Sequence, residues 1–276
     1  MQNKLVFVLL DGLQSTYAKE HLGYLEHLCE KRKAARFEVL GELPSASRPM
    51  YETIFTGLPV YKHGIANNGI CRLSKYPSIF HLLQAQGRKS MAAAYYWISE
   101  LYLSAPFDQV NDILQEDKDA CIQKGFFYYE DTFPDDHLYS IASNFMEKES
   151  YDFVFLHPMN IDDAGHRFGA GSMPYAQAVM NNDRQLSAWI PVWVQKGYSV
   201  VIGADHGMST QGYHGGNSKE QRETAWYVID DRFKGGPQEQ KLTTLDIAPM
   251  LCQLLGVQTS EMMKKWEGMP NDKEKQ

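Results

Sequence analysis

The sequence predicts one large α/β domain built around a parallel β-sheet. Its 276 residues, of which 43% are hydrophobic and 12% aromatic, are enough for a sizeable core. Residues 5–10 (LVFVLL) form a continuous apolar run, which is typical of a strand covered on both faces of a sheet. After this run, helical and extended patterns alternate at the spacing of β/α units.

Short apolar runs predict the strands, and amphipathic stretches predict the helices. Gly87 and Gly256 are expected to end two helices, because glycine readily adopts the left-handed conformation at a helix C-terminus. Pro191 is expected to kink or end another helix near Ile190, because proline lacks the backbone N–H. The expected elements are strand 5–10, helix 17–33, strand 37–40, a serine turn that enters a short helix at 44–57, helix 79–86, strand 90–95, helix 135–148, strand 151–156, a loop at 160–173, helix 175–196, strand 198–203, strand 226–229 and helix 245–255.

Residues 95–134 are the least regular part of the chain and are rich in aromatic side chains. We expect this stretch to fold over one end of the sheet as a small cap or lid, while aromatic clusters of this kind are also typical of a core. The sequence therefore predicts a single domain over 1–269 and a polar tail over 270–276.

Charge and cysteine content exclude several function classes. The net charge is −7 and no run of lysine or arginine occurs, so a nucleic-acid polymer is not an expected partner. The four cysteines lie far apart, which argues against a thiolate metal site and a disulfide framework. The apolar run at 5–10 is too short for a signal peptide, and no segment reaches the roughly 18 apolar residues of a membrane span. We expect a soluble, cytoplasmic protein without a membrane partner.

The turn at 44–57 (PSASRPMYETIFTG) carries hydroxyl groups to the start of a helix. Pro49 suits the first turn, and Ser47 or Arg48 would then occupy the cap. A serine hydroxyl there lies at the positive end of the helix, which favours an anion such as phosphate or sulfate. The same residues are also compatible with an ordinary Ser-Pro helix cap.

Acidic and imidazole side chains follow three of the predicted strands. Because these strands end at one edge of one sheet, their side chains are expected to share a site. Three carboxylates and three imidazoles suit a pair of divalent ions of the zinc or manganese kind. The candidate ligands are Asp11, Asp162, His166, Asp205, His206 and His214.

Each fragment also has a purely structural interpretation. Asp11 and Asp162 could cap helices or loops, and His214 could be a surface turn residue. Asp205-His206-Gly207 is harder to explain in this way. The shared position of the fragments after strands favours a metal site over these separate explanations.

The order of these motifs resembles the alkaline phosphatase superfamily, closest to its type I phosphodiesterase/nucleotide pyrophosphatase branch. The resemblance covers nearly the whole chain. It is carried by Asp11-Gly12, Ser47 before a helix ending in Thr56-Gly57, His63-Gly64-Ile65, Asp162-x-x-Gly165-His166, Asp205-His206-Gly207-Met208, His214-Gly215 and Leu245-Asp246-Ile247-Ala248-Pro249. It implies a three-layer α/β/α sandwich with a central mostly parallel sheet, at most a small cap, and two bound metal ions, usually zinc.

The resemblance also implies a role for each matching residue. One ion would be held by Asp162, His166 and His214, and the other by Asp11, Asp205 and His206. The nucleophile of the family falls on Ser47, and Ser45 is the alternative hydroxyl.

Two features depart from the pattern of the branch. Met50 stands where an asparagine usually follows the nucleophile, so the phosphate-binding donor must come from elsewhere. Arg48, beside the nucleophile, and Asn68, after the His-Gly-Ile motif, are the candidates, although both could be ordinary surface or turn residues. His214 follows the Asp-His pair without an intervening cap domain, which implies a small substrate pocket.

These features together predict a metal-dependent phosphoric ester hydrolase that forms a phospho-serine intermediate. A small-molecule diester or nucleotide pyrophosphate is the expected substrate. A phosphomonoesterase or phosphonate hydrolase on the same scaffold is the alternative, because one fold hosts several chemistries. A non-catalytic module that binds a phosphorylated ligand is a further alternative from another class. The sequence does not indicate which oligomeric state the protein adopts.

Overall fold

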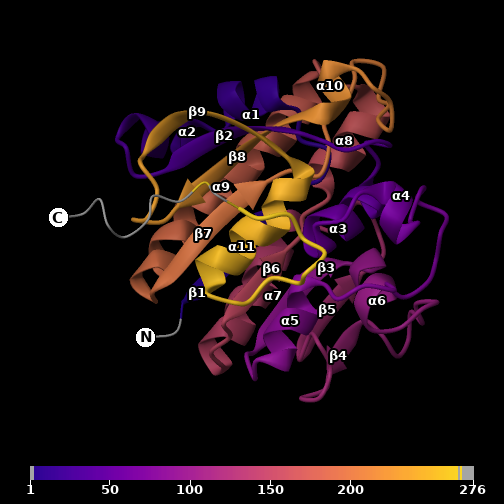
Figure 1. The fold of residues 1–276 in the computed structure, drawn as a ribbon. Coiled ribbons are helices and arrows are strands. Elements are labelled where there is room, and N and C mark those ends of the chain that lie inside the picture. Colours follow the sequence, from indigo (N-terminus) through magenta and orange to yellow (C-terminus); the bar gives the residue numbers. More distant parts are fainter. Residues whose placement is uncertain (1–2, 267, 269–276) are drawn as a thin grey trace.

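The computed structural model describes residues 3–266 and 268, and within this part of the chain a nine-stranded sheet lies between two layers of helices (Figure 1). The strands are β1 (Lys4–Leu9), β2 (Ala35–Leu40), β3 (Ser90–Tyr95), β4 (Leu114–Glu116), β5 (Lys124–Tyr128), β6 (Phe153–Leu156), β7 (Tyr198–Gly203), β8 (Glu223–Ile229) and β9 (Gly236–Thr243). The helices are α1 (Ser15–His21), α2 (Gly23–Glu30), α3 (Ser47–Thr56), α4 (Val60–His63), α5 (Ile79–Ala85), α6 (Trp97–Tyr102), α7 (Asp135–Lys148), α8 (Asn160–Phe168), α9 (Met173–Gln195), α10 (Lys219–Arg222), the 3₁₀ helix η1 (Thr244–Asp246) and α11 (Ile247–Leu255).

The sheet is mostly parallel, as predicted. Its strand order is β4-β5-β3-β6-β1-β7-β8-β2-β9. Strands β5, β3, β6, β1 and β7 pair in parallel with one another in this order, and β2 pairs in parallel with β9. Strand β8 is antiparallel to β7 and to β2, and β4 is antiparallel to β5. Strands β6, β1 and β7, which precede the acidic motifs, are therefore adjacent and run in the same direction.

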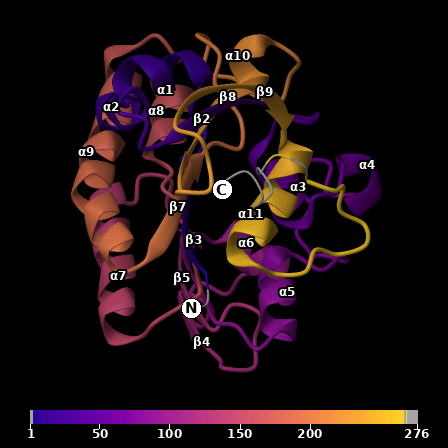
Figure 2. The ribbon, with the colours of Figure 1, turned by 60° about the vertical axis from the view of Figure 1, so that its left-hand side comes forward.

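The central strand β1 is buried on both faces, which explains its continuous apolar sequence. Leu5, Phe7 and Leu9 pack into the core on one face of the sheet. Val6 and Val8 pack into the core on the other face. Figure 2 shows the two helix layers from the side, with α7, α8 and α9 on one side of the sheet and α3, α5, α6 and α11 on the other.

Several elements differ from the sequence-based expectation. The helix expected over 17–33 is divided into α1 and α2, because Leu22 leaves the helical conformation just before Gly23. Helix α9 continues past Pro191 to Gln195. The buried side chains of Ile190 and Trp193 keep both sides of the proline packed on the sheet. Helix α4 and strand β9 are additional elements.

Residues 95–134 were expected to form a small cap or lid or to belong to the core. This segment contains α6, β4 and β5. Strand β5 pairs with β3, so part of this segment extends the sheet. The expected polar tail at 270–276 lies outside the described residues. Among the helices of residues 3–266, none has the length and apolar character that a membrane crossing requires.

Candidate metal centre and nucleophile

Three adjacent parallel strands bring the predicted ligands to one edge of the sheet. Asp11 follows β1, and Asp205 and His206 follow β7. After β6 the structure has helix α8 where a loop was expected, and this helix carries Asp162 and His166. Parallel neighbours end at the same edge, so residues distant in the sequence meet there. We call these five residues and His214 the six-residue cluster.

The innermost part of the cluster is fully buried. The side chains of Asp11, Asp205 and His206 are 0% exposed. His206 Nε2 lies 3.4 Å from Asp11 Oδ1 and 3.2 Å from Asp205 Oδ2. His206 Nδ1 lies 2.9 Å from the carbonyl oxygen of Gly207, which is consistent with an Nδ1–H donor and an Nε2 lone pair directed at the carboxylates.

The outer part of the cluster opens toward solvent. His166 Nε2 lies 3.3 Å from Asp162 Oδ2, because the two residues are one helical turn apart on α8. His214 Nε2 lies 3.1 Å from His166 Nε2. The rings of His206 and His214 stack with centroids 3.8 Å apart and so join the two parts. His166 is 44% exposed at its side chain, which gives this part access from outside.

The donors of the cluster fit divalent ions. Asp11 Oδ1, Asp162 Oδ1 and Asp205 Oδ2 are buried and lack a hydrogen-bond partner, so each aspartate has one unpaired oxygen. Ligand atoms of Asp11, Asp205 and His206 lie within 4.8 Å of one another, as do those of Asp162, His206 and His214. Buried unpaired carboxylate oxygens are costly unless a cation or a donor meets them.

The pKa shifts of the cluster residues also favour bound divalent ions. Burial raises the pKa of Asp205 well above its usual value, and the nearby carboxylates of Asp11 and Asp162 raise it further. The hydrogen bond with Asp162 raises the pKa of His166 to about 9, whereas burial lowers the pKa of His214 to about 4. Three neighbouring buried carboxylates repel one another, and divalent cations would remove this repulsion.

Ser47 is the hydroxyl that reaches the cluster. Its Oγ lies 3.1 Å from His206 Nε2. The N-cap of α3 is Ala46 and not Ser47 or Arg48 as expected, so the Ser47 hydroxyl is not used as a helix cap. Ser47 is the first residue of α3, where the helix dipole favours an anion. Met50 is buried in the core.

Arg48, one of the two candidate phosphoryl-binding residues, has its guanidinium paired inside the protein. Its Nη2 lies 2.7 Å from Glu100 Oε2, and its Nη1 donates to the carbonyl oxygen of Ile70 at 3.2 Å. The guanidinium also lies over the ring of Trp97, 4.6 Å from its centroid. Burial of Arg48 with a carboxylate, which the sequence did not reveal, gives both nitrogens partners within the protein, and the phosphoryl-binding role of Arg48 stays a prediction. Asn68 Oδ1 accepts the Arg48 backbone N–H at 3.1 Å, which holds Asn68 beside the start of α3.

Two residues that the sequence did not indicate, Tyr51 and His157, contact Asp11. The Tyr51 hydroxyl donates to Asp11 Oδ2, and His157 Nε2 lies 2.9 Å from the same oxygen. Two signals could have pointed to them. Tyr51 follows Ser47 by four residues on one helix, and His157 comes directly after strand β6, just as Asp11 comes shortly after β1.

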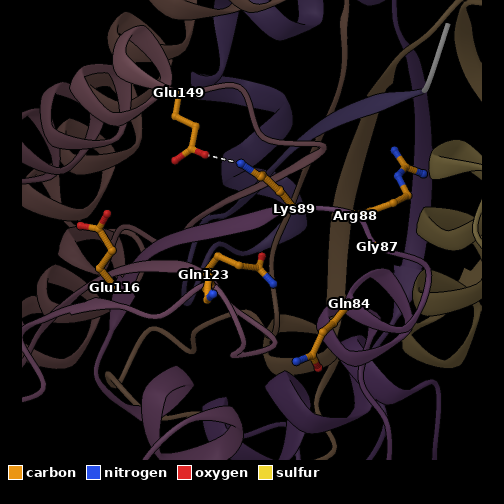
Figure 3. Close-up of a pocket in the computed structure, with 8 residues that line it drawn as sticks. Gln84, Gly87, Arg88, Lys89, Glu116, Gln123 and Glu149 are labelled. Atoms are coloured by element: carbon orange, nitrogen blue, oxygen red, sulfur yellow. Dashed lines mark hydrogen bonds and ion pairs between the residues drawn. The ribbon is translucent and has the colours of Figure 1, made fainter.

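A separate pocket of about 310 Å³ lies at the opposite end of the sheet. It is lined by residues at the amino ends of β3 and β5, among them Lys89 and Gln123 (Figure 3). Lys89 points toward Glu149 and pairs with it. The six-residue cluster does not line this pocket, which has the character of a charged surface recess.

A model of the type I phosphodiesterase/nucleotide pyrophosphatase family matches residues 5–237. The chain belongs to this family. The match includes all six residues of the cluster together with Ser47. Membership confirms the resemblance to the alkaline phosphatase superfamily that the motifs indicated.

Solved structures of this family and of related enzymes share the fold. Murine ectonucleotide pyrophosphatase/phosphodiesterase 5, an inactive form in complex with AMP, matches with a TM-score of 0.75 at 14% identity, over 94% of this chain and 96% of that one. A 2-O glycosaminoglycan sulfatase matches with a TM-score of 0.67 at 12% identity, over 96% of this chain and 73% of that one. These matches confirm the α/β/α architecture.

Curated relatives include proteins that are named for a transferase activity. GPI ethanolamine phosphate transferase 2 of Candida albicans is 21% identical over 295 residues, which cover 96% of this chain and 32% of that protein. The catalytic subunit of the Homo sapiens GPI ethanolamine phosphate transferase 2 is 23% identical over 271 residues, covering 92% of this chain and 26% of that protein. The chain thus spans about a third or less of the length of these relatives.

Proposed function

We propose that this protein is a metal-dependent hydrolase of small phosphoric diesters that acts through a phosphorylated Ser47. The observation that carries the proposal is the position of the Ser47 hydroxyl, 3.1 Å from His206 Nε2, which itself lies 3.4 Å from Asp11 Oδ1 and 3.2 Å from Asp205 Oδ2. A nucleophile beside a set of metal ligands is an arrangement that metal-dependent phosphoryl transfer uses. Membership in the phosphodiesterase family supports the same reaction class.

The cluster divides into two proposed ion sites. Asp11, Asp205 and His206 would hold the buried ion, and Asp162, His166 and His214 the outer one. Zinc is the first candidate and manganese the second, because imidazole and carboxylate ligands suit both. When bound, divalent ions at such sites polarise phosphoryl oxygens and neutralise the charge that develops on them.

The residues of the chain itself have distinct roles in this scheme. Ser47 Oγ loses its proton to solvent and forms a bond to phosphorus while the bond to the leaving alcohol breaks, and the leaving oxygen takes up a proton from solvent. Water then releases the phosphoryl group from Ser47. In this scheme Asn68 donates to the phosphoryl group through its amide nitrogen, and the acceptance of the Arg48 N–H by its Oδ1 supports this orientation of the amide.

A substrate panel tests this proposal. Protein loaded with zinc or with manganese is assayed with bis-p-nitrophenyl phosphate, p-nitrophenyl phosphate, an aryl phosphonate and an aryl sulfate. The proposal expects the diester to have the highest kcat/KM. A preference for the monoester or the phosphonate would favour the alternative hydrolases. Stoichiometric metal without turnover of any of the four would favour a non-catalytic binding module.

A second candidate function is transfer of the phosphoryl group to an acceptor alcohol instead of water. It is favoured by the names of the curated relatives, which are ethanolamine phosphate transferases. Both functions share the phospho-serine step and differ in what attacks it. The names of the relatives indicate that ethanolamine phosphate is the transferred group, so the donor to use is a diester of ethanolamine phosphate. Product analysis with this donor and an increasing concentration of an acceptor alcohol separates the two functions, because a transferase gives mainly the new diester and a hydrolase gives mainly free ethanolamine phosphate.

A further inference from the structure

The carboxylate of Asp11 has two different oxygens. Oδ2 accepts a hydrogen bond from the Tyr51 hydroxyl and lies 2.9 Å from His157 Nε2. Oδ1 has no hydrogen-bond partner and faces His206 Nε2 at 3.4 Å. All four side chains are fully buried. Protein donors therefore hold one oxygen of Asp11, and the other is left for an ion.

Asp205 shows the same division with a different donor. Its Oδ1 accepts the backbone N–H of Gly12 at 3.2 Å, and its Oδ2 is unpaired. Each aspartate of the buried site thus keeps one oxygen bonded to the protein and offers the other. The backbone orients Asp205, whereas Asp11 depends on two side chains.

Those two side chains are themselves held in place. The His157 ring stacks on the ring of Phe155, with centroids 5.8 Å apart. The Tyr51 ring packs against the His157 ring in a T-shaped arrangement, with centroids 4.8 Å apart. The backbone N–H of His157 donates to Ala93 on the neighbouring strand β3 at 3.0 Å. Tyr51 lies on α3, four residues after Ser47. Any displacement of Tyr51 would therefore shift the nucleophile helix relative to Asp11.

We propose that Tyr51 and His157 are positioning residues that fix Asp11 as a ligand through its Oδ1 alone, and that they thereby set the affinity of the buried ion site. Ligand carboxylates are commonly oriented by such outer hydrogen bonds, and loss of one typically weakens metal binding about 10- to 100-fold. This inference rests on the proposed metal sites.

The test is metal affinity, measured by competition with a chromogenic chelator for zinc. Tyr51→Phe removes only the hydroxyl and should weaken one of the two binding events about tenfold, leaving the other unchanged. His157→Leu should weaken the same event by a similar factor. His157→Gln should restore most of the affinity, because the amide nitrogen of glutamine can reach the position of Nε2 and donate to Asp11.

Tyr139→Phe is the matched control. Tyr139 is also fully buried, and its hydroxyl lies 3.2 Å from Asn182 on the other face of the sheet, away from Asp11. Its variant should bind both ions with parental affinity. The inference would be overturned if Tyr51→Phe and His157→Leu bound both ions within about threefold of the parent, or if Tyr139→Phe weakened binding equally.

The parent protein separates this inference from the proposed function. A parent that binds no zinc or manganese contradicts the metal sites themselves. A parent that binds two ions, together with unaffected Tyr51 and His157 variants, contradicts only the positioning role.

Discussion

The two serines of the nucleophile turn have different partners, which assigns them different roles. The Ser45 hydroxyl donates to the carbonyl oxygen of Gly216 at 2.8 Å. The carbonyl oxygen of Ser45 lies 3.2 Å from His214 Nδ1. Ser45 therefore anchors the loop that carries His214, and Ser47 keeps its hydroxyl for the cluster.

This difference predicts separate effects for the two alanine variants. Ser47→Ala should lower turnover about a thousandfold or more, as loss of a covalent nucleophile commonly does, with unchanged metal content. Ser45→Ala should lower zinc occupancy instead, because the loop that carries His214 loses the hydrogen bond from the Ser45 hydroxyl to the Gly216 carbonyl oxygen. Turnover and elemental analysis on the same samples distinguish the two. Near-parental turnover of Ser47→Ala would exclude it as the nucleophile.

Arg48 contributes through its pairing with Glu100. Both side chains are buried, with exposed fractions of 3% and 6%. Arg48→Ala leaves the Glu100 carboxylate without its partner, so we expect the free energy of unfolding to fall by about 3–5 kcal/mol in urea denaturation. The double variant Arg48→Met, Glu100→Gln removes both charges and should recover part of this loss.

The double variant also tests the phosphoryl-binding role expected for Arg48 from the sequence. If the guanidinium serves only the buried pair, kcat/KM of the double variant should lie close to that of the parent. A stable double variant with a large and equal loss on diester and monoester substrates would show that Arg48 binds the phosphoryl group.

At the scale of elements, α3 is the helix on which the site depends. All ten of its residues are buried, although half of its sequence is polar or charged. Glu52 shows how this is possible. Its carboxylate accepts the hydroxyl of Tyr102 at 3.0 Å and contacts that of Ser74. Burial raises the pKa of Glu52 from its usual 4.5 to about 7.

The raised pKa predicts a pH-dependent stability. Between pH 4.5 and 7 the folded protein keeps a proton on Glu52 that the unfolded chain has released. The stabilisation is therefore complete below pH 4.5 and is lost as the pH rises through 7. Relative to Glu52→Gln, the parent should lose about 2–3 kcal/mol of unfolding free energy between pH 5 and 8. Urea denaturation across this range measures the difference, and parallel curves for the two proteins would contradict it.

At the scale of the whole molecule, the six-residue cluster brings together residues that lie as far apart in the sequence as Asp11 and His214. Five of its residues come after the central strands β1, β6 and β7, and His214 lies in the loop between β7 and α10. Without ions, three buried carboxylates repel one another at this junction. Bound ions should therefore stabilise the entire fold as well as the site.

Removal of metal should accordingly lower the melting temperature. An ion at a free concentration of one hundred times its Kd stabilises a protein by about 2.7 kcal/mol. For a domain of this size, we expect a decrease of about 5 °C on dialysis against chelator, and recovery on addition of zinc. Identical thermal scans before and after chelation, with metal loss verified by elemental analysis, would contradict a structural contribution of the ions.

The sequence alone determined the fold class and the strands that precede the acidic motifs. Periodicity identifies a buried strand such as 5–10 because its pattern is local, and parallel strands place their carboxyl ends at one edge. The candidate ligands other than His214 could be grouped from that rule alone. The motif order also sufficed to identify the family.

Only the tertiary structure decided which polar groups meet inside the molecule. The pairing of Arg48 with Glu100, and the contacts of Tyr51 and His157 with Asp11, join residues from different elements. Such contacts depend on how helices lie on the sheet, and no local pattern encodes that arrangement. The helix at 160–168 was missed for a related reason, because its polar sequence is stabilised by packing and by the cluster instead of by a long apolar stripe.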